Sequence, residues 1–366
     1  MKFVKADELK LGMRLAKPIY NKKGVLLYER NSKLTQQGIE SVKNFGLIGI
    51  YILEPAEPLP PMTDDDIEFE KFQSVSVFTI KDELQGLIKN GKQTKIYPFA
   101  DSIIKSYGRL DHKINFVQNL RSNDDFIYKH SLNVAILCAL ICHKMNLRPD
   151  EQRDTVIAAV IHAIGLLNVP EELSKKQELT GEEKKARFGY ELSGMSIVEE
   201  AFLSSPNIKR IAQAAIRHKM SVETGEEAAA GKIPAGSKVL IVADAYDSMT
   251  AMNVAGETPF SEIAALKNLM NNPEIYDKDV VDALIGSINF LAEGCSVELS
   301  NGEKALVVSS NDRNILRPMV LLFSTNKLVD LAQTAFYGDI EIEDIMKTLD
   351  NRYVIDSDAV KRFKGE

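Results

Sequence analysis

The feature that most constrains the fold of this chain is a long stretch, residues 72–291, in which apolar residues recur with helical spacing almost throughout. In residues 126–145 the apolar positions step by three, four or seven, which predicts a helix with one buried face. Residues 155–165 and 238–251 are apolar enough to form further buried helices. We therefore expect an all-helical domain over residues 72–291.

The two ends of the chain have patterns typical of short strands. Near the N-terminus, residues 13–19 and 25–28 flank a turn signal that ends in Gly24, and Thr35 is expected to cap a helix that runs to Phe45. The remaining expected strands are residues 49–53, 296–299, 305–309, 319–323 and 327–331, and a short helix is expected near residues 342–349.

Residues 54–71 begin with clustered prolines and an acidic run, EPAEPLPPMTDDD, which is typical of a linker. The predicted fold class is therefore mainly α. A small α+β N-terminal domain (1–53) and a linker (54–71) precede an all-helical domain (72–291), and a β-rich C-terminal extension (292–366) follows it.

Composition limits the function classes. The chain has 366 residues, of which 45% are apolar and 27% are charged, so it is long and balanced enough for more than one globular core. A net charge of −7 gives no basic surface for DNA, RNA or an anionic membrane. Cys138 and Cys142 lie four residues apart in a helical pattern and are expected to be small core residues in a reducing compartment.

The first residues, MKFVKADELKLGMRL, carry charges where a signal peptide needs an apolar core. No apolar stretch is expected to approach the roughly 20 residues of a membrane span. The sequence therefore predicts a cytoplasmic protein with no membrane span.

Four polar residues stand out because they lie in the apolar faces of predicted helices. They are His130, His162, His218 and Asp244. Histidines and a carboxylate on successive helices are a pattern typical of a metal centre. A lone histidine on an apolar face is also commonly a core residue that bonds to a backbone carbonyl or a carboxylate. Both interpretations stay open for His130 and His162, and the second is favoured for His218. Asp244 needs a partner in such a helix, and His130, His162 and Arg217 are the candidates.

The order of these residues and their neighbours resembles the HD-GYP branch of the HD-domain superfamily. The resemblance rests on the motifs at 128–135 (YKHSLNVA), 160–165 (VIHAIG), 179–183 (LTGEE), 211–219 (IAQAAIRHK), 233–234 (IP) and 242–250 (VADAYDSMT). It covers roughly residues 120–265. It implies an all-helical metal-dependent phosphodiesterase that hydrolyses cyclic di-GMP at a centre of two or three metal ions.

The residues that the resemblance implies for the metal centre are only partly present. His130, His162, His218 and Asp244 match ligand positions. Alanine at position 163 replaces the aspartate that would bridge two metal ions. The other departures are Tyr190 and Arg217 in place of histidine ligands, Lys219 in place of a glutamate, Leu166 in place of a lysine and Asn253 in place of an arginine. The loss of a bridging carboxylate and a fixed positive charge at Arg217 argue against a two-metal site.

Two hypotheses for the function follow. The first is a degenerate HD-GYP-type protein that acts in cyclic di-GMP signalling by binding a signalling protein or a cyclic dinucleotide. The alternative is a metal-dependent phosphohydrolase with one ion at His130, His162 and Asp244, where iron, manganese or zinc would be acceptable. The first hypothesis needs no cofactor. The sequence leaves a homodimer open in both cases.

Overall fold

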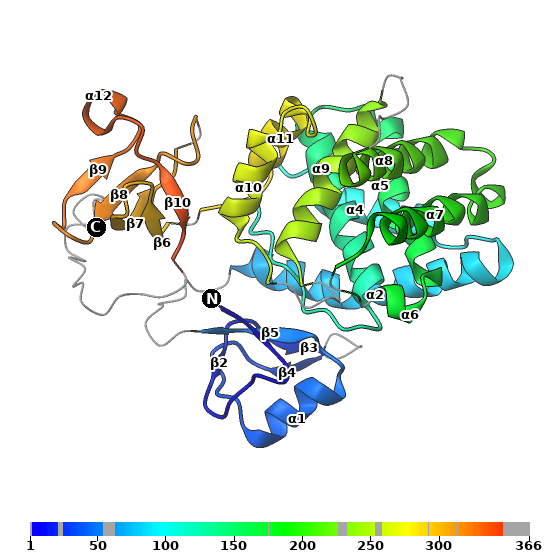
Figure 1. The fold of residues 1–366 in the computed structure, drawn as a ribbon, viewed down its shortest axis with the longest axis horizontal. Helices are drawn as coiled ribbons and strands as arrows, with labels where there is room; N and C mark the ends of the chain where they lie inside the picture. The colour runs from blue at the N-terminus through cyan, green and yellow to red at the C-terminus, as the bar shows by residue number, and fades with distance from the viewer. Residues whose placement is uncertain are drawn as a thin grey trace.

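The structure is a computed structural model that describes residues 2–20, 25–53, 63–174, 176, 178–225, 233–252, 258–291, 293–311 and 313–346. Its central region is helical, a small β/α part precedes it, and a five-stranded antiparallel sheet follows it (Figure 1). This arrangement confirms the predicted fold class.

The N-terminal part holds one three-stranded antiparallel sheet in the order β1-β5-β2, a β3-β4 hairpin and one helix. Its elements are β1 (Lys2–Lys5), β2 (Arg14–Leu15), β3 (Ile19–Tyr20), β4 (Leu26–Tyr28), α1 (Gln36–Asn44) and β5 (Gly49–Leu53). The side chain of Thr35 accepts a hydrogen bond from the backbone N–H of Gly38, which confirms the predicted cap. The predicted strand at 13–19 is wrong as a continuous element, because β2 and β3 are separated in sequence and lie in different sheets.

The central region is a bundle of helices around α4. Its elements are α2 (Asp64–Asn90), α3 (Ile96–Tyr107), α4 (Phe126–Lys144), α5 (Pro149–Ile161), the 3₁₀ helix η1 (Ile164–Asn168), α6 (Glu171–Ser174), α7 (Gly181–Ile197), η2 (Glu200–Phe202), α8 (Pro206–Thr224), α9 (Ala235–Thr250), α10 (Glu262–Asn271) and α11 (Lys278–Ile285).

The expected linker is shorter than the sequence predicts. Residues 54–62 lie outside the described residues, but the acidic run Asp64, Asp65 and Asp66 forms the first turn of α2. Thr63 caps this helix in a reciprocal capping box with Asp66, and acidic side chains interact favourably with the positive end of the helix dipole. The capping box therefore starts a helix where the sequence alone indicated solvated chain.

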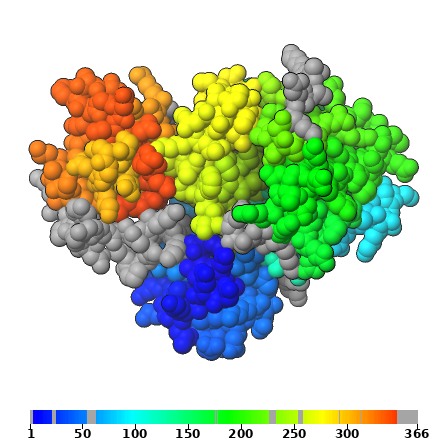
Figure 2. All heavy atoms as spheres, in the orientation of Figure 1, coloured from blue at the N-terminus to red at the C-terminus, as the bar shows by residue number. Residues whose placement is uncertain are grey.

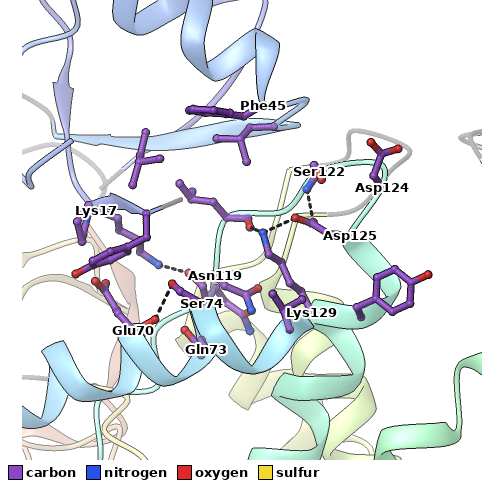
Figure 3. Close-up of a pocket in the computed structure, with 18 of the residues that line it drawn as sticks. Lys17, Phe45, Glu70, Gln73, Ser74, Asn119, Ser122, Asp124, Asp125 and Lys129 are labelled. Atoms are coloured by element: carbon purple, nitrogen blue, oxygen red, sulfur yellow. Dashed lines mark hydrogen bonds and ion pairs between the residues drawn. The ribbon is translucent and has the colours of Figure 1, made fainter. Parts of the chain in front are cut away.

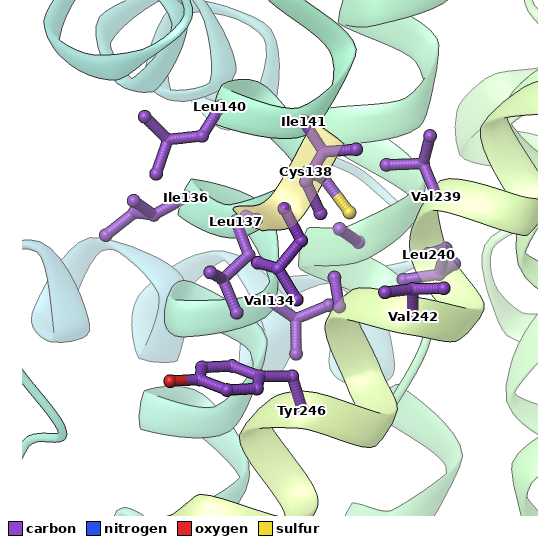
Figure 4. Close-up of a cluster of buried hydrophobic side chains, with 14 of the residues drawn as sticks. Val134, Ile136, Leu137, Cys138, Leu140, Ile141, Val239, Leu240, Val242 and Tyr246 are labelled. Carbon is purple, nitrogen blue, oxygen red and sulfur yellow. The ribbon is translucent and has the colours of Figure 1, made fainter. Parts of the chain in front are cut away.

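Helix α4 is buried on nearly every side, not along the single face that its spacing predicted. Figure 4 shows Val134 and Cys138 of α4 packed near Val242 and Val239 of α9, and all four are inaccessible to solvent. The helix is long and apolar enough to cross a membrane by length and composition alone, which corrects the expectation that no such stretch exists. However, 78% of its most apolar 18-residue window is buried inside the protein, as a central core helix requires.

The C-terminal sheet has the strand order β10-β6-β7-β8-β9, and all of its pairs are antiparallel. Its elements are β6 (Ser296–Leu299), β7 (Lys304–Ser309), β8 (Met319–Leu322), β9 (Leu328–Asp330), α12 (Thr334–Tyr337) and β10 (Ile342–Ile345). The helix expected near residues 342–349 is wrong over its described part. Ile342 pairs with Leu299 and is fully buried, so pairing with the edge of β6 decides the conformation there.

The space-filling view shows the N-terminal part (blue) and the C-terminal sheet (orange) as separate lobes against the helical region (Figure 2). The C-terminal sheet contacts α10, and Lys267 of α10 lies 2.8 Å from Glu343 of β10. The N-terminal part is joined to the helical region by a backbone hydrogen bond from Ile48 N–H to the carbonyl of Arg121 (2.9 Å) and by a β-bridge between Leu47 and Ser122.

A contact between two glycines sets the distance between η1 and α7. A Cβ atom on Gly165 would lie 2.1 Å from the backbone oxygen of Tyr190, and one on Gly194 would lie 2.6 Å from the backbone nitrogen of Gly165. Only residues without a side chain allow this approach. The contact places η1, which follows His162 and Ala163, directly against α7.

We expect Gly165→Ala to lower the free energy of unfolding by about 1–3 kcal/mol, because the new methyl group meets backbone atoms that cannot rotate away. Chemical denaturation followed by circular dichroism would measure it. Gly189→Ala is the matched control on α7, because its Cβ meets nothing within 4 Å, and alanine should stabilise the helix by about 0.5–1 kcal/mol. Equal effects of both substitutions would contradict this account of the packing.

Candidate metal centre

Three of the predicted ligands come together in the helical region. His130 lies on α4, His162 directly follows α5 and Asp244 lies on α9, and all three are buried. One ligand atom from each lies within 4.8 Å of the other two. The Nε2 atoms of the two histidines are 3.2 Å apart, and Oδ1 of Asp244 lies 3.0 Å from Nε2 of His130 and 3.9 Å from Nε2 of His162.

The other nitrogen of each ring has a partner that orients the ring. His162 Nδ1–H donates to the backbone carbonyl of Ala159 (2.6 Å), and His130 Nδ1–H donates to Oδ2 of Asp247 (2.6 Å). Both Nε2 atoms therefore point to the same place as Asp244. This use of Nδ1 to fix ring orientation is the arrangement that supports histidine ligands in metal sites.

Lys219 of α8 is the direct cationic partner of Asp244. Its Nζ lies 2.9 Å from Oδ2 of Asp244. Burial acts to raise the pKa of Asp244, but Lys219, His130 and His162 outweigh it and hold that pKa well below its usual range. Burial likewise acts to lower the pKa of Lys219, and the charge of Asp244 reverses this, so the pKa is raised. The ammonium is therefore a stable positive charge at the centre.

A second buried ion pair lies behind His130. Arg121 donates through its NH2 nitrogen to both carboxylate oxygens of Asp247, at 2.7 and 2.6 Å, and neither side chain is accessible to solvent. Asn133 donates to the same carboxylate (2.9 Å). Burial opposes ionisation of Asp247, but Arg121 and His130 hold its pKa below the usual range. Burial also acts to lower the pKa of His130, and its hydrogen bonds to Asp244 and Asp247 raise it instead.

These residues form a chain of alternating charges in the order Arg121, Asp247, His130, Asp244, Lys219. Sequence reasoning missed the roles of Arg121, Asp247 and Lys219 in it. A signal for Asp247 was present, because residues three apart on a helix share a face and Asp247 follows Asp244 at that spacing. Arg121 precedes α4 in a segment with no periodic pattern, and nothing in the sequence marks it as buried.

The remaining predicted positions lie in different surroundings. Ala163 is buried next to His162 and brings no ligand atom. Leu166 and Tyr190 are half-buried, and Arg217 is exposed on α8, so the positive charge at the centre comes from Lys219 and not from Arg217. His218 Nε2–H donates to the backbone carbonyl of Ile275 (3.0 Å), which is the kind of partner that a structural histidine has. Asn253 lies outside the described residues.

Two imidazole nitrogens and one carboxylate oxygen fit one divalent transition metal ion. Such an ion would act as a Lewis acid toward water or a phosphoryl oxygen. It would need the lone pair of His130 Nε2 and would share Asp244 with Lys219. The residues present therefore fit a single ion, in competition with a proton on His130 and the ammonium of Lys219.

We expect Asp247→Asn to lower the free energy of unfolding by about 3–5 kcal/mol, because it leaves Arg121 as a buried charge without a carboxylate. Thermal and urea unfolding would measure it. Asp282→Asn removes an exposed pair with Lys278 (2.5 Å) and should leave stability nearly unchanged. If the two variants have similar stability, the Arg121 and Asp247 pair does not hold the site together.

Comparison with known proteins agrees with this geometry. Residues 116–280 match the model of the HD domain family. A cyclic di-GMP phosphodiesterase of Borreliella burgdorferi is 26% identical over 207 residues, which cover 55% of this chain and 53% of that protein. Another, of Pseudomonas aeruginosa, is 22% identical over 243 residues, which cover 64% of this chain and 57% of that protein.

The chain thus spans little more than half the length of the curated relatives that it matches. No solved structure matches the chain. The HD model extends over α4, α5, α8 and α9, the helices that bring His130, His162, Lys219 and Asp244 together. Residues 116–280 are an HD domain with distant homology to cyclic di-GMP phosphodiesterases of the HD-GYP type.

Proposed function

We propose that this protein acts in cyclic di-GMP signalling as a degenerate HD-GYP-type protein, which binds a signalling protein or a cyclic dinucleotide and has no multinuclear metal centre. The observation that supports this most is the ion pair between Lys219 and Asp244, together with the alanine at position 163, which brings no carboxylate. Two dications about 3.5–4 Å apart need bridging anionic ligands. Here an ammonium from the protein supplies positive charge at the same carboxylate.

The centre is also stable without a metal ion in electrostatic terms. Asp244 is neutralised by His130 and Lys219, and Asp247 by Arg121 and His130. Each buried carboxylate thus has cationic partners, as burial of charge requires. The HD scaffold is kept, while cations from the protein pair with the carboxylates at its centre. This combination favours a binding role over metal-dependent hydrolysis. In the same proposal the protein is cytoplasmic, and a homodimer remains compatible with it.

A second candidate is a phosphohydrolase with one metal ion at His130, His162 and Asp244. The specific observation in its favour is the orientation of both imidazoles by Ala159 and Asp247, which leaves both Nε2 atoms directed at Asp244. In this candidate a phosphate group bound to the ion would lie next to Asp244. The ammonium of Lys219, which pairs with Asp244, could then also contact that phosphate. Measured turnover decides between the two candidates.

Lys219→Gln should raise the affinity for Mn²⁺ about tenfold, because the ion would no longer compete with an ammonium for Asp244. Ala163→Asp should raise it as well by adding a fourth ligand. Isothermal titration of both variants and of the wild type would test this. Neither variant nor the wild type should hydrolyse cyclic di-GMP with Mn²⁺, because the second ion remains without ligands. Metal-dependent turnover by the wild type would replace our first proposal with the second.

Metal binding should strengthen as the pH rises from about 6 to 8. The pKa of His130 is raised above its usual value, so the protonated form persists to higher pH, and a metal ion must displace that proton from Nε2. Titrations with Mn²⁺ in steps of pH would measure the affinity, with Lys219→Gln as the comparison. An affinity that stays constant or falls with rising pH would show that His130 is not a ligand.

A further inference from the structure

A cavity of about 730 Å³ lies between the N-terminal part and the helical region, on the side of residues 117–122 that faces α1 and β3. Its walls come from Lys17–Tyr20 and Asn44–Leu47 of the N-terminal part, from α2 and from residues 117–129. Cavities that bind small molecules in proteins have volumes of roughly 300–1,000 Å³ and commonly lie between domains. Neither His130, His162 nor Asp244 lines this cavity, so it is distinct from the metal centre.

One end of the cavity holds a hydrogen-bond acceptor without a donor. Oε2 of Glu70 is buried and has no hydrogen-bond partner within the part of the chain that the structure describes. An unpaired buried polar atom of this kind lowers the free energy of unfolding by about 1–3 kcal/mol, and by more when it is charged. Burial raises the pKa of Glu70 to about 7. A ligand that donates a hydrogen bond to Oε2 would remove this cost.

A donor lies at the same end. Lys17 gives one of its three N–H groups to the backbone carbonyl of Gln118 (2.7 Å), and Figure 3 shows its side chain close to that of Glu70. Burial lowers the pKa of Lys17 to about 8, although the charge of Glu70 acts in the opposite direction. The pKa shifts of both groups indicate that this end of the cavity disfavours additional charge. A neutral ligand suits it better than an ion.

The rest of the cavity wall is mixed. About half of its residues are apolar or aromatic, and the others, which include Lys81, Asp124, Asp125 and Lys129, are polar or charged. Ile19, Val77, Phe78 and Leu120 line it, and Phe45 of the N-terminal part lies across from α2. Flat aromatic compounds bury well against such side chains. The cavity therefore combines an acceptor next to a donor at one end with apolar surfaces beside them.

We propose that this cavity binds a nucleobase or a related heteroaromatic compound through its lactam edge, with the ring N–H donating to Glu70 and the adjacent ring carbonyl accepting from Lys17. Guanine and uracil have this edge. The N1-methyl derivative of guanosine and the N3-methyl derivative of uridine have no ring N–H on this edge, and they would leave the Glu70 acceptor unpaired. Apolar walls would contact the ring faces, as in sites that hold a base outside a duplex.

Titration of the full chain at pH 7.5 with four nucleosides tests the proposal. Guanosine and uridine should bind at least about tenfold more tightly than N1-methylguanosine and N3-methyluridine, which is the loss expected for one unmade hydrogen bond to a charged group. Nucleosides carry no phosphate, so phosphate recognition at the metal centre does not contribute to the signal. Calorimetry or nuclear magnetic resonance would give the affinities.

Glu70→Gln should weaken guanosine binding about tenfold, and Lys17→Met should weaken it by a similar factor. Glu68→Gln is the matched control, because Glu68 is exposed on the same helix and does not line the cavity. Equal binding of all four nucleosides, no saturable binding at millimolar concentration, or full affinity in Glu70→Gln would each overturn the proposal. Activity or inactivity toward cyclic di-GMP has no bearing on this outcome.

Discussion

The HD domain is organised around a buried row of alternating charges, from Arg121 through Asp247, His130 and Asp244 to Lys219. The row runs from the segment before α4 to α9, then to α4, back to α9 and finally to α8. In a medium of low polarity each member depends on its neighbours, because removal of one partner leaves a buried charge uncompensated, at a cost of about 3–5 kcal/mol. The helices are therefore fixed relative to one another by charge pairing as well as by the apolar packing of α4.

This row explains how a site with metal-ligand geometry can exist without a full ligand set. The two histidines and Asp244 keep the positions that a metal ion would require, since backbone and carboxylate partners hold the rings. The ammonium of Lys219 brings a positive charge to the same carboxylate. The geometry of the ligands and a positive charge at Asp244 are therefore supplied by different residues of the chain.

Much of this fold could be predicted from periodicity, because α4, α5 and α9 are long apolar segments whose neighbours cover them. Prediction failed where a partner distant in sequence decides the conformation. Ile342 pairs with Leu299 at the edge of the sheet, which no local sequence pattern predicts. The first turn of α2 depends on a capping box at Thr63. At the centre, the motif order found His130, His162 and Asp244. It could not show which of the basic residues on α8 faces inward, and Lys219 rather than Arg217 does so.

The backbone at Arg121 belongs to two units at once. Its carbonyl accepts a hydrogen bond from Ile48 of the N-terminal part, while its guanidinium is held in the helical core by Asp247. Detachment of the N-terminal part would leave that carbonyl without its partner and would loosen the residue that orients His130 through Asp247. The boundary between the two parts is therefore an unsuitable place to cut the chain. A fragment that begins at α2 would report on a different centre from that of the intact protein.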